Sequence, residues 1–137
     1  MDPAQALADL AEISSQIEVA VLFDDDGAVV GSTVDDADTA RALVRGALGL
    51  LEGAGSFRSE GGRVTQLEAA TSEGSVFVVR GDGRGIVATT GPQPTVGLVF
   101  YDLKSCLRGA GKEPEPEKPK RRRRAPAAEN EAGSDEA

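Results

Sequence analysis

The sequence predicts a small α+β domain, in which helices pack on a sheet, followed by a charged tail. Apolar residues at helical spacing mark the helices, and short apolar runs bounded by turn residues mark the strands. The resulting order is helix, two strands, helix, three strands, helix and tail. The 137 residues suit one such domain, with residues 1–110 as the folded part and residues 111–137 as the tail.

The first part of the chain is expected to form a helix and a hairpin. Asp2 and Pro3 are typical of a helix N-cap and of a proline in the first helical turn. The apolar run at 17–23 predicts a central strand that is buried on both faces. Asp26-Gly27 is a strong hairpin signal, so residues 28–33 are expected to form the returning strand.

A second helix, three strands and a last helix complete the predicted domain. The second helix spans 36–52 and begins in an Asp-rich stretch that suits a helix N-terminus. It is expected to end near Gly53 or Gly55, within a glycine-rich connection at 53–63. Pro92 ends the strand register, and apolar residues from Val96 onward then recur at helical spacing. Gly109 and Gly111 mark the expected end of this helix. The three strands are predicted at 64–70, 75–80 and 85–90.

The composition argues against catalysis. The chain has no His, and its single Cys, Cys106, falls within the last helix, where we expect a packed side chain. The run 24–27 resembles a calcium loop only faintly, because its glycine is in the wrong position and the final Glu is missing. We therefore expect no enzyme activity, cofactor, metal or small-molecule substrate. A cytoplasmic protein is expected, because neither a bilayer-spanning apolar run nor a signal peptide is evident.

Charge divides the chain into two parts. The tail holds 7 of the 15 basic and 7 of the 23 acidic residues, which leaves 8 basic and 16 acidic residues in 1–110 and a net charge of −8 there. Such an acidic domain prefers basic partner surfaces. The tail has no aromatic or branched apolar residue, so we expect it to be disordered.

The tail carries one basic block that suggests a function. Its clustered cations include Lys120, Arg121, Arg122, Arg123 and Arg124. Such a block predicts weak, salt-sensitive binding to nucleic acid or anionic membrane. The alternative is a solvated tail whose own Glu clusters screen these cations.

The strand at 64–70 has the pattern of a sheet edge. It alternates polar and apolar residues, whereas the next strand is uniformly apolar at 76–79. An unpaired edge is a template for another chain. Either Glu68 keeps this edge solvated, or two copies pair along it. Gly46 and Gly49 in the second helix favour a dimer if a partner helix approaches them, and the alternative is close packing on the chain's own sheet.

Together these features resemble the roadblock / dynein light chain family, in its bacterial branch, over residues 4–108. The resemblance rests on the element order and on the segments IEVAVLFDDDGAVVGST, RALVRGALGLLE, GSVFVVRGDGRGIVATT and GPQPTVGLVFYDLKSCL. It implies an α+β sandwich of the profilin/longin-like roadblock type. In that fold a five-stranded antiparallel sheet of order 2-1-5-4-3 has two helices on one face and the 36–52 helix on the other.

The resemblance also implies a noncatalytic homodimeric adaptor that binds a Ras-like small GTPase. Such an adaptor either stimulates GTP hydrolysis or serves as a scaffold. The dimer is expected to form through the edge strand and the second helix. The residues expected in this interface are Val64, Gln66, Leu67, Glu68, Leu43, Gly46, Ala47 and Leu50.

Arg41, Arg45 and Glu52 are the candidates for contact with the GTPase. Arg41 and Arg45 lie one helical turn apart and can both face an acidic partner, although an ordinary solvated helix face gives the same pattern. Two other functions compete with this one. The first is tethering through the Arg-rich tail, and the second is a small sensory domain that holds a ligand against Phe77 and Phe100.

Overall fold

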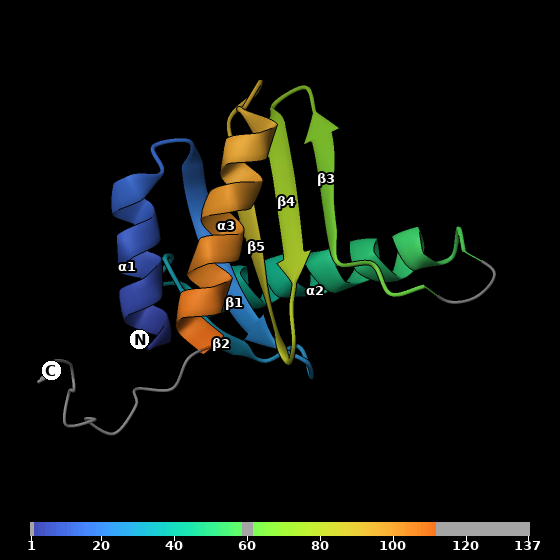
Figure 1. The fold of residues 1–137 in the computed structure, drawn as a ribbon, viewed down its shortest axis with the longest axis horizontal. Coiled ribbons are helices and arrows are strands. Elements are labelled where there is room, and N and C mark those ends of the chain that lie inside the picture. The colour runs from blue at the N-terminus through green and yellow to red at the C-terminus, as the bar shows by residue number, and fades with distance from the viewer. Residues whose placement is uncertain (1, 59–61, 112–137) are drawn as a thin grey trace, which may run out of the picture.

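A computed structural model describes residues 2–58 and 62–111, which form a five-stranded sheet with three helices packed on it (Figure 1). The strands lie in the order β2-β1-β5-β4-β3, and every neighbouring pair is antiparallel, so the predicted topology is confirmed. The strands are β1 (Ile17–Asp24), β2 (Val29–Ser32), β3 (Gln66–Thr71), β4 (Gly74–Arg80) and β5 (Arg84–Thr90).

The helices lie on the two faces of the sheet as predicted. Helices α1 (Pro3–Ile13) and α3 (Val96–Gly111) lie side by side on one face, and α2 (Ala37–Gly55) lies on the other. Figure 1 shows that α2 crosses the strands and that its C-terminal part reaches beyond β3. No helix within residues 2–58 and 62–111 is both long and apolar enough to cross a membrane.

Local sequence signals explain where the first two helices begin. Asp2 caps α1, because its carboxylate accepts a hydrogen bond of 2.8 Å from the Gln5 N–H, and Pro3 occupies the first turn. Asp36 caps α2 in the same way and accepts from the Asp38 N–H. The cap of α1 falls at the predicted residue, and the cap of α2 falls within the Asp-rich stretch where that helix was expected to begin.

The alternation of side chains along the strands builds two hydrophobic clusters. On β1, Ala20 and Leu22 face the α1/α3 layer, whereas Val21 and Phe23 face α2. All four are at most 1% exposed. This confirms β1 as a central strand that is buried on both faces.

The run Asp24 to Gly27 forms the β1–β2 hairpin. The Asp24 carboxylate accepts hydrogen bonds of 2.9 Å from the N–H groups of Asp26 and Ala28, and Gly27 adopts a φ of +87°. The aspartates of this run therefore act as turn residues that hold the hairpin. Within the described part of the chain, no group of three or more His, Cys, Asp or Glu side chains could hold a metal ion.

The predicted strand boundaries agree with the structure to within two residues, and the largest difference is at the start of β3. Strand β3 begins two residues later than predicted, because the Val64 carbonyl accepts its hydrogen bond from the Arg80 side chain (2.8 Å). Helix α2 ends at Gly55 and α3 ends at Gly111, in each case at the second of the two glycines where the end was expected. Glycine thus weakens these helix ends without stopping the helix at the first glycine.

Candidate interaction surfaces

Strand β3 leaves one edge of the sheet without a partner strand among the described residues. The Arg80 N–H donates to the Thr65 carbonyl oxygen at 2.8 Å, so these two residues form a hydrogen-bonded pair. Because such pairs alternate along an antiparallel ladder, the backbone groups of Gln66, Glu68 and Ala70 point away from β4. The edge therefore presents a regular row of donors and acceptors.

The predicted interface side chains of β3 have mixed exposure. Gln66 and Glu68 are exposed, and the Glu68 carboxylate also accepts a hydrogen bond of 3.0 Å from the Ser75 hydroxyl. Val64 and Leu67 are half-buried and pack against the core beneath α2. The edge thus combines polar groups with apolar side chains that reach the surface.

Helix α2 presents glycines on its outer face. No heavy atom other than the local helix backbone and chain neighbours lies within 4 Å of a Cβ atom built at Gly46, Gly49 or Gly53. Close packing on the chain's own sheet therefore does not explain Gly46 and Gly49, and that alternative is wrong. Leu50, beside this stripe, is 38% exposed.

Two other predicted interface residues of α2 lie closer to the core. Leu43 is half-buried. Ala47 is 1% exposed and packs in the cluster between α2 and the sheet, so its side chain lies away from the outer face. The prediction that Ala47 contacts a partner is therefore corrected: at about 100° per residue, it falls on the buried side of the helix.

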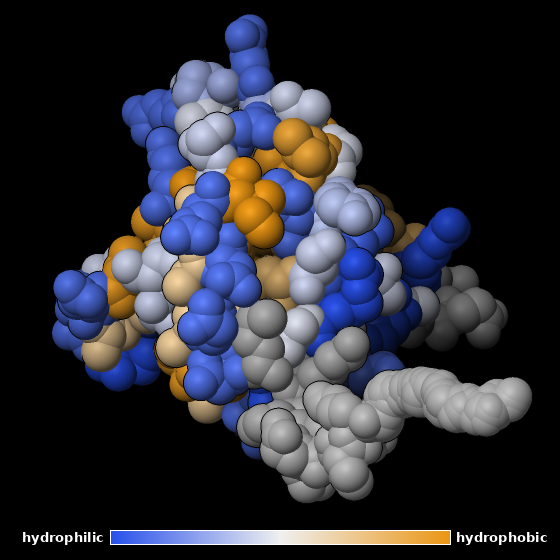
Figure 2. Space-filling view, turned by 60° about the vertical axis from the view of Figure 1, so that its left-hand side comes forward, coloured by the Kyte–Doolittle hydropathy of each residue, from blue (hydrophilic) through white to orange (hydrophobic). Residues whose placement is uncertain are grey.

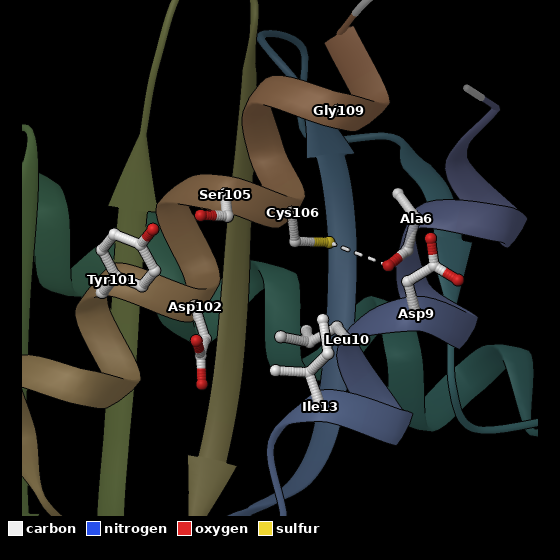
Figure 3. A pocket seen from close by; sticks show the side chains of 9 residues that line it. All are labelled: Ala6, Asp9, Leu10, Ile13, Tyr101, Asp102, Ser105, Cys106 and Gly109. Carbon is white, nitrogen blue, oxygen red and sulfur yellow. Dashed lines mark hydrogen bonds between the residues drawn. The ribbon is translucent and has the colours of Figure 1, made fainter.

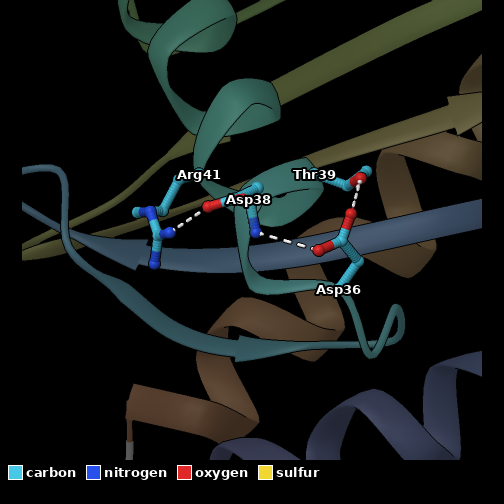
Figure 4. Close-up of polar contacts among 4 residues, drawn as sticks. All are labelled: Asp36, Asp38, Thr39 and Arg41. Atoms are coloured by element: carbon cyan, nitrogen blue, oxygen red, sulfur yellow. Dashed lines mark hydrogen bonds and ion pairs between the residues drawn. The ribbon is translucent and has the colours of Figure 1, made fainter.

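Arg41, Arg45 and Glu52 share one flank of α2. At about 100° per residue they fall within an arc of about 40°, and all three are exposed. Arg41 forms an ion pair with Asp38 in the first turn (Figure 4). Arg45 has no carboxylate within 4.0 Å in the described part of the chain, and its charge is available to a partner.

The start of α2 keeps its negative charge. The Thr39 hydroxyl donates to the Asp36 carboxylate at 2.6 Å (Figure 4), and this bond, together with the Asp38 N–H, lowers the pKa of Asp36. The flank that carries Arg41 and Arg45 therefore has acidic residues at one end. A partner would meet both signs of charge here.

A groove separates α1 from α3 on the opposite face of the molecule. It encloses about 310 Å³, and Figure 3 shows its lining, including Leu10, Ile13 and Tyr101. Ile13 and Tyr101 are 71% and 64% exposed. Figure 2 shows hydrophobic side chains among hydrophilic ones on the surface of this side of the molecule.

Cys106 lies at the base of this groove. Its thiol donates to the Ala6 carbonyl oxygen at 3.5 Å (Figure 3), and it is buried, as predicted. Burial, with a smaller effect of the Asp9 carboxylate, raises the pKa of the thiol to about 11. A thiol that stays protonated at neutral pH is a poor nucleophile.

A basic cleft lies at the end of α3, and the sequence analysis missed it. The basic cleft is lined by Arg80, Arg84, Lys104 and Arg108, and it encloses about 540 Å³. Lys104 and Arg108 lie one turn apart on α3, which is a local signal. Arg80 and Arg84 flank the β4–β5 turn, and only the packing of α3 beside that turn brings the four together.

A sequence-family model for the Roadblock/LC7 domain matches residues 4–90, which is more than half of the chain. The chain belongs to the Roadblock/LC7 domain family. No curated protein matches it. The matched residues include the β3 edge and all of α2, so both surfaces described first are part of the Roadblock/LC7 domain itself.

Solved structures share the fold of this Roadblock/LC7 domain. A Roadblock/LC7 domain from Streptomyces avermitilis has a TM-score of 0.69 at 23% identity, over 80% of this chain and 94% of that one. The gliding protein MglB from Thermus thermophilus has a TM-score of 0.60 at 17% identity, over 77% and 83%. An MglB in a tetrameric arrangement has a TM-score of 0.61 at 16% identity, over 77% and 82%.

Two further predictions were a ligand site at Phe77 and Phe100 and a binding site on the basic tail. The rings of Phe77 and Phe100 pack edge to face with centroids 5.0 Å apart, and neither ring lines the groove or the basic cleft. A ligand site between these rings therefore has no support. The predicted tail cations, from Lys120 to Arg124, lie outside the described residues.

Proposed function

We propose that this Roadblock/LC7 domain protein is a noncatalytic homodimeric adaptor that binds a Ras-like small GTPase. The observation that carries the proposal is the family match over residues 4–90. It agrees with the function that the resemblance to bacterial roadblock proteins implies. The composition supports an adaptor rather than an enzyme, because the chain has no His and its one thiol is buried.

The surface formed by β3 and the outer face of α2 supports a homodimer. The outward backbone groups of β3 can pair with the same strand of a second copy, which would extend the sheet. Helix α2 reaches beyond β3 (Figure 1), so it would then meet the α2 helix of that copy. Gly46 and Gly49 would allow these two helices to approach closely, and Leu50 would lose its exposed apolar surface.

The Arg41, Arg45 and Glu52 flank is the surface that we assign to the GTPase. It lies beside the glycine stripe on the same helix, so it would stay accessible next to the dimer contact. Two copies would present the flank twice. The guanidinium of Arg45, which has no carboxylate within 4.0 Å among residues 2–58 and 62–111, can form charge-assisted hydrogen bonds with an acidic partner surface.

The test is binding of the full chain to purified small GTPases of the same organism. Each GTPase is loaded with GDP or with a GTP analogue, and its affinity is measured by calorimetry. We expect one GTPase to bind in a nucleotide-dependent manner. Arg41→Glu with Arg45→Glu should weaken that binding at least about tenfold, which is about 1.4 kcal/mol.

The matched control is Lys104→Glu with Arg108→Glu, which reverses two cations with the same spacing on α3. This control should leave GTPase binding unchanged. If no small GTPase binds the full chain, the proposed function is wrong. If the control variant loses binding and the α2 variant keeps it, the GTPase site lies on α3 instead. GTP hydrolysis measured with and without the chain separates stimulation from scaffolding.

A further inference from the structure

The basic cleft gathers cations in a domain that is otherwise acidic. Arg63 lies beside the four lining cations, because its guanidinium donates to the Gly81 carbonyl oxygen at 3.1 Å. Five of the 8 basic residues in 1–110 therefore meet at one place. Within residues 2–58 and 62–111, none of the five has a carboxylate within 4.0 Å.

The cations of the basic cleft are held by neutral groups rather than by counter-ions. Arg84 donates to the Ala110 carbonyl oxygen at 2.6 Å, and Arg80 donates to that of Val64 at 2.8 Å. Burial and the neighbouring charge of Arg63 lower the pKa of Arg80, and Asp25 opposes this shift more weakly. Among the described residues, Asp82 is the one acidic residue that lines the cleft. Repulsion among the cations is therefore only partly relieved, and an anionic ligand would relieve it further.

The chain itself supplies a suitable anion next to the cleft. Gly111 lines the cleft, and the sequence continues as Lys112, Glu113, Pro114, Glu115, Pro116, Glu117. Glu113 is two residues beyond Gly111, and two residues span at most about 7 Å. The prolines disfavour helix at Glu113 and Glu115, so the sequence does not favour continuing α3 through these positions.

We propose that the basic cleft binds the chain's own acidic segment, Glu113 to Glu117, through its three carboxylates. Lys112 opposes this contact with one positive charge. Attachment at Gly111 favours it, because a short connection gives an effective concentration on the order of millimolar. The inference does not depend on the GTPase-binding flank of α2, which lies on the other face of the sheet, but the cleft does border the β3 edge, because Gln66 lines it.

The contact would change which partners can reach the basic cleft and the basic run 118–124. An acidic partner could enter the cleft only by displacing the Glu113 to Glu117 segment. At the same time, glutamates that bind the cleft cannot screen the basic run 118–124 that follows them. The cleft would thereby leave that run available for an anionic partner.

The test uses the ¹⁵N-labelled full chain and follows the backbone amides of Gly81, Asp82 and Gly83 by NMR. Raising the salt concentration from about 0.01 M to about 1 M shortens the Debye length from about 30 Å to about 3 Å. We expect these amides to shift with salt in the natural sequence. In Glu113→Gln, Glu115→Gln, Glu117→Gln they should be shifted already at low salt and lose most of the salt response.

Two variants complete the test. Glu129→Gln, Glu131→Gln, Glu136→Gln removes the same charge farther along the tail and should leave the cleft amides as in the natural sequence. Lys104→Glu, Arg108→Glu should abolish the salt response, while unchanged α2 amides show that the domain stays folded. The proposal is overturned if the two glutamine variants give the same spectrum at the cleft. It is also overturned if the shifts disappear on dilution, because the contact would then join two copies.

Discussion

The two faces of the sheet are covered to different extents. On the face of α1 and α3, 14 buried residues form the hydrophobic cluster, and 3 half-buried ones lie at its margin. Beneath α2 only 8 residues are buried, and 8 more are half-buried around them. Two helices thus bury the sheet residues beneath them more completely, although Ile13 and Tyr101 stay exposed at the groove between the helices, whereas one helix leaves a wide half-buried apolar margin on the other face.

This difference predicts which layer of the domain would take part in the proposed dimer. The half-buried margin under α2 includes Val64, Leu67 and Leu43, which belong to the predicted dimer surface. Apolar area that is only partly removed from water gains free energy when a second surface covers it, at about 25 cal/mol per Å². The α1/α3 layer should therefore determine the stability of one copy, and the α2 layer its association.

The largest expected effect is on stability, and it tests the face of the sheet that α1 and α3 cover. Leu103→Ala on α3 removes a side chain that is 0% exposed, and it should lower the free energy of unfolding by about 3 kcal/mol. The matched control is Leu50→Ala on α2, which should cost less than about 1 kcal/mol in dilute protein, because the side chain is partly solvated. Urea unfolding at low protein concentration gives both values. Equal losses would mean that the two faces do not differ in this way.

The next largest effect is on self-association, and it tests the face of the sheet that α2 covers. Gly49→Gln places a long side chain where the isolated domain has free space, so the fold should gain up to about 1 kcal/mol from better helix propensity. The same side chain would block a closely packed partner helix. We expect the dissociation constant of the homodimer, measured by analytical ultracentrifugation, to rise at least about tenfold, or about 1.4 kcal/mol.

The control for this substitution is Gly97→Gln on α3. Gly97 also has no heavy atom within 4 Å of a built Cβ, apart from the local helix backbone and chain neighbours, but it lies in the layer of α1 and α3. It should leave self-association unchanged. An unchanged dissociation constant in Gly49→Gln would exclude the α2 stripe from the dimer contact.

Signals that act over a few residues made much of the fold predictable. The Asp2 cap, the Asp-rich start of α2 and the Asp26-Gly27 hairpin each depend on hydrogen bonds within four residues, so the sequence places them correctly. The strand order was different, because periodicity alone did not order the strands. It came from the resemblance to a family, and the structure confirms it.

The surfaces were harder to predict for reasons of geometry. Ala47 was placed at the interface with Leu50, and the two positions are only about 60° apart around the helix. The boundary between the buried and the exposed side of α2 runs between them, because Ala47 is 1% exposed and Leu50 is 38% exposed. The basic cleft combines Arg63 and Arg80 with Arg108, which is 45 positions after Arg63. No local pattern joins such residues; the packing of α3 against the β4–β5 turn does.

The smallest expected effect on stability concerns the contact between α1 and α3 at Cys106, and it appears only at high pH. Burial raises the pKa of Cys106 from 9.0 to about 11, so between these values the folded state holds a proton that the unfolded chain has lost. The free energy of unfolding should therefore fall as pH rises from 9.0 to about 11, and this contribution is complete below pH 9.0. Cys106→Ala should remove that part of the decline in urea unfolding measured across this range. The same pH dependence in both proteins would mean that the thiol ionises without opening this contact, and the α1/α3 layer would then be less closed than its burial indicates.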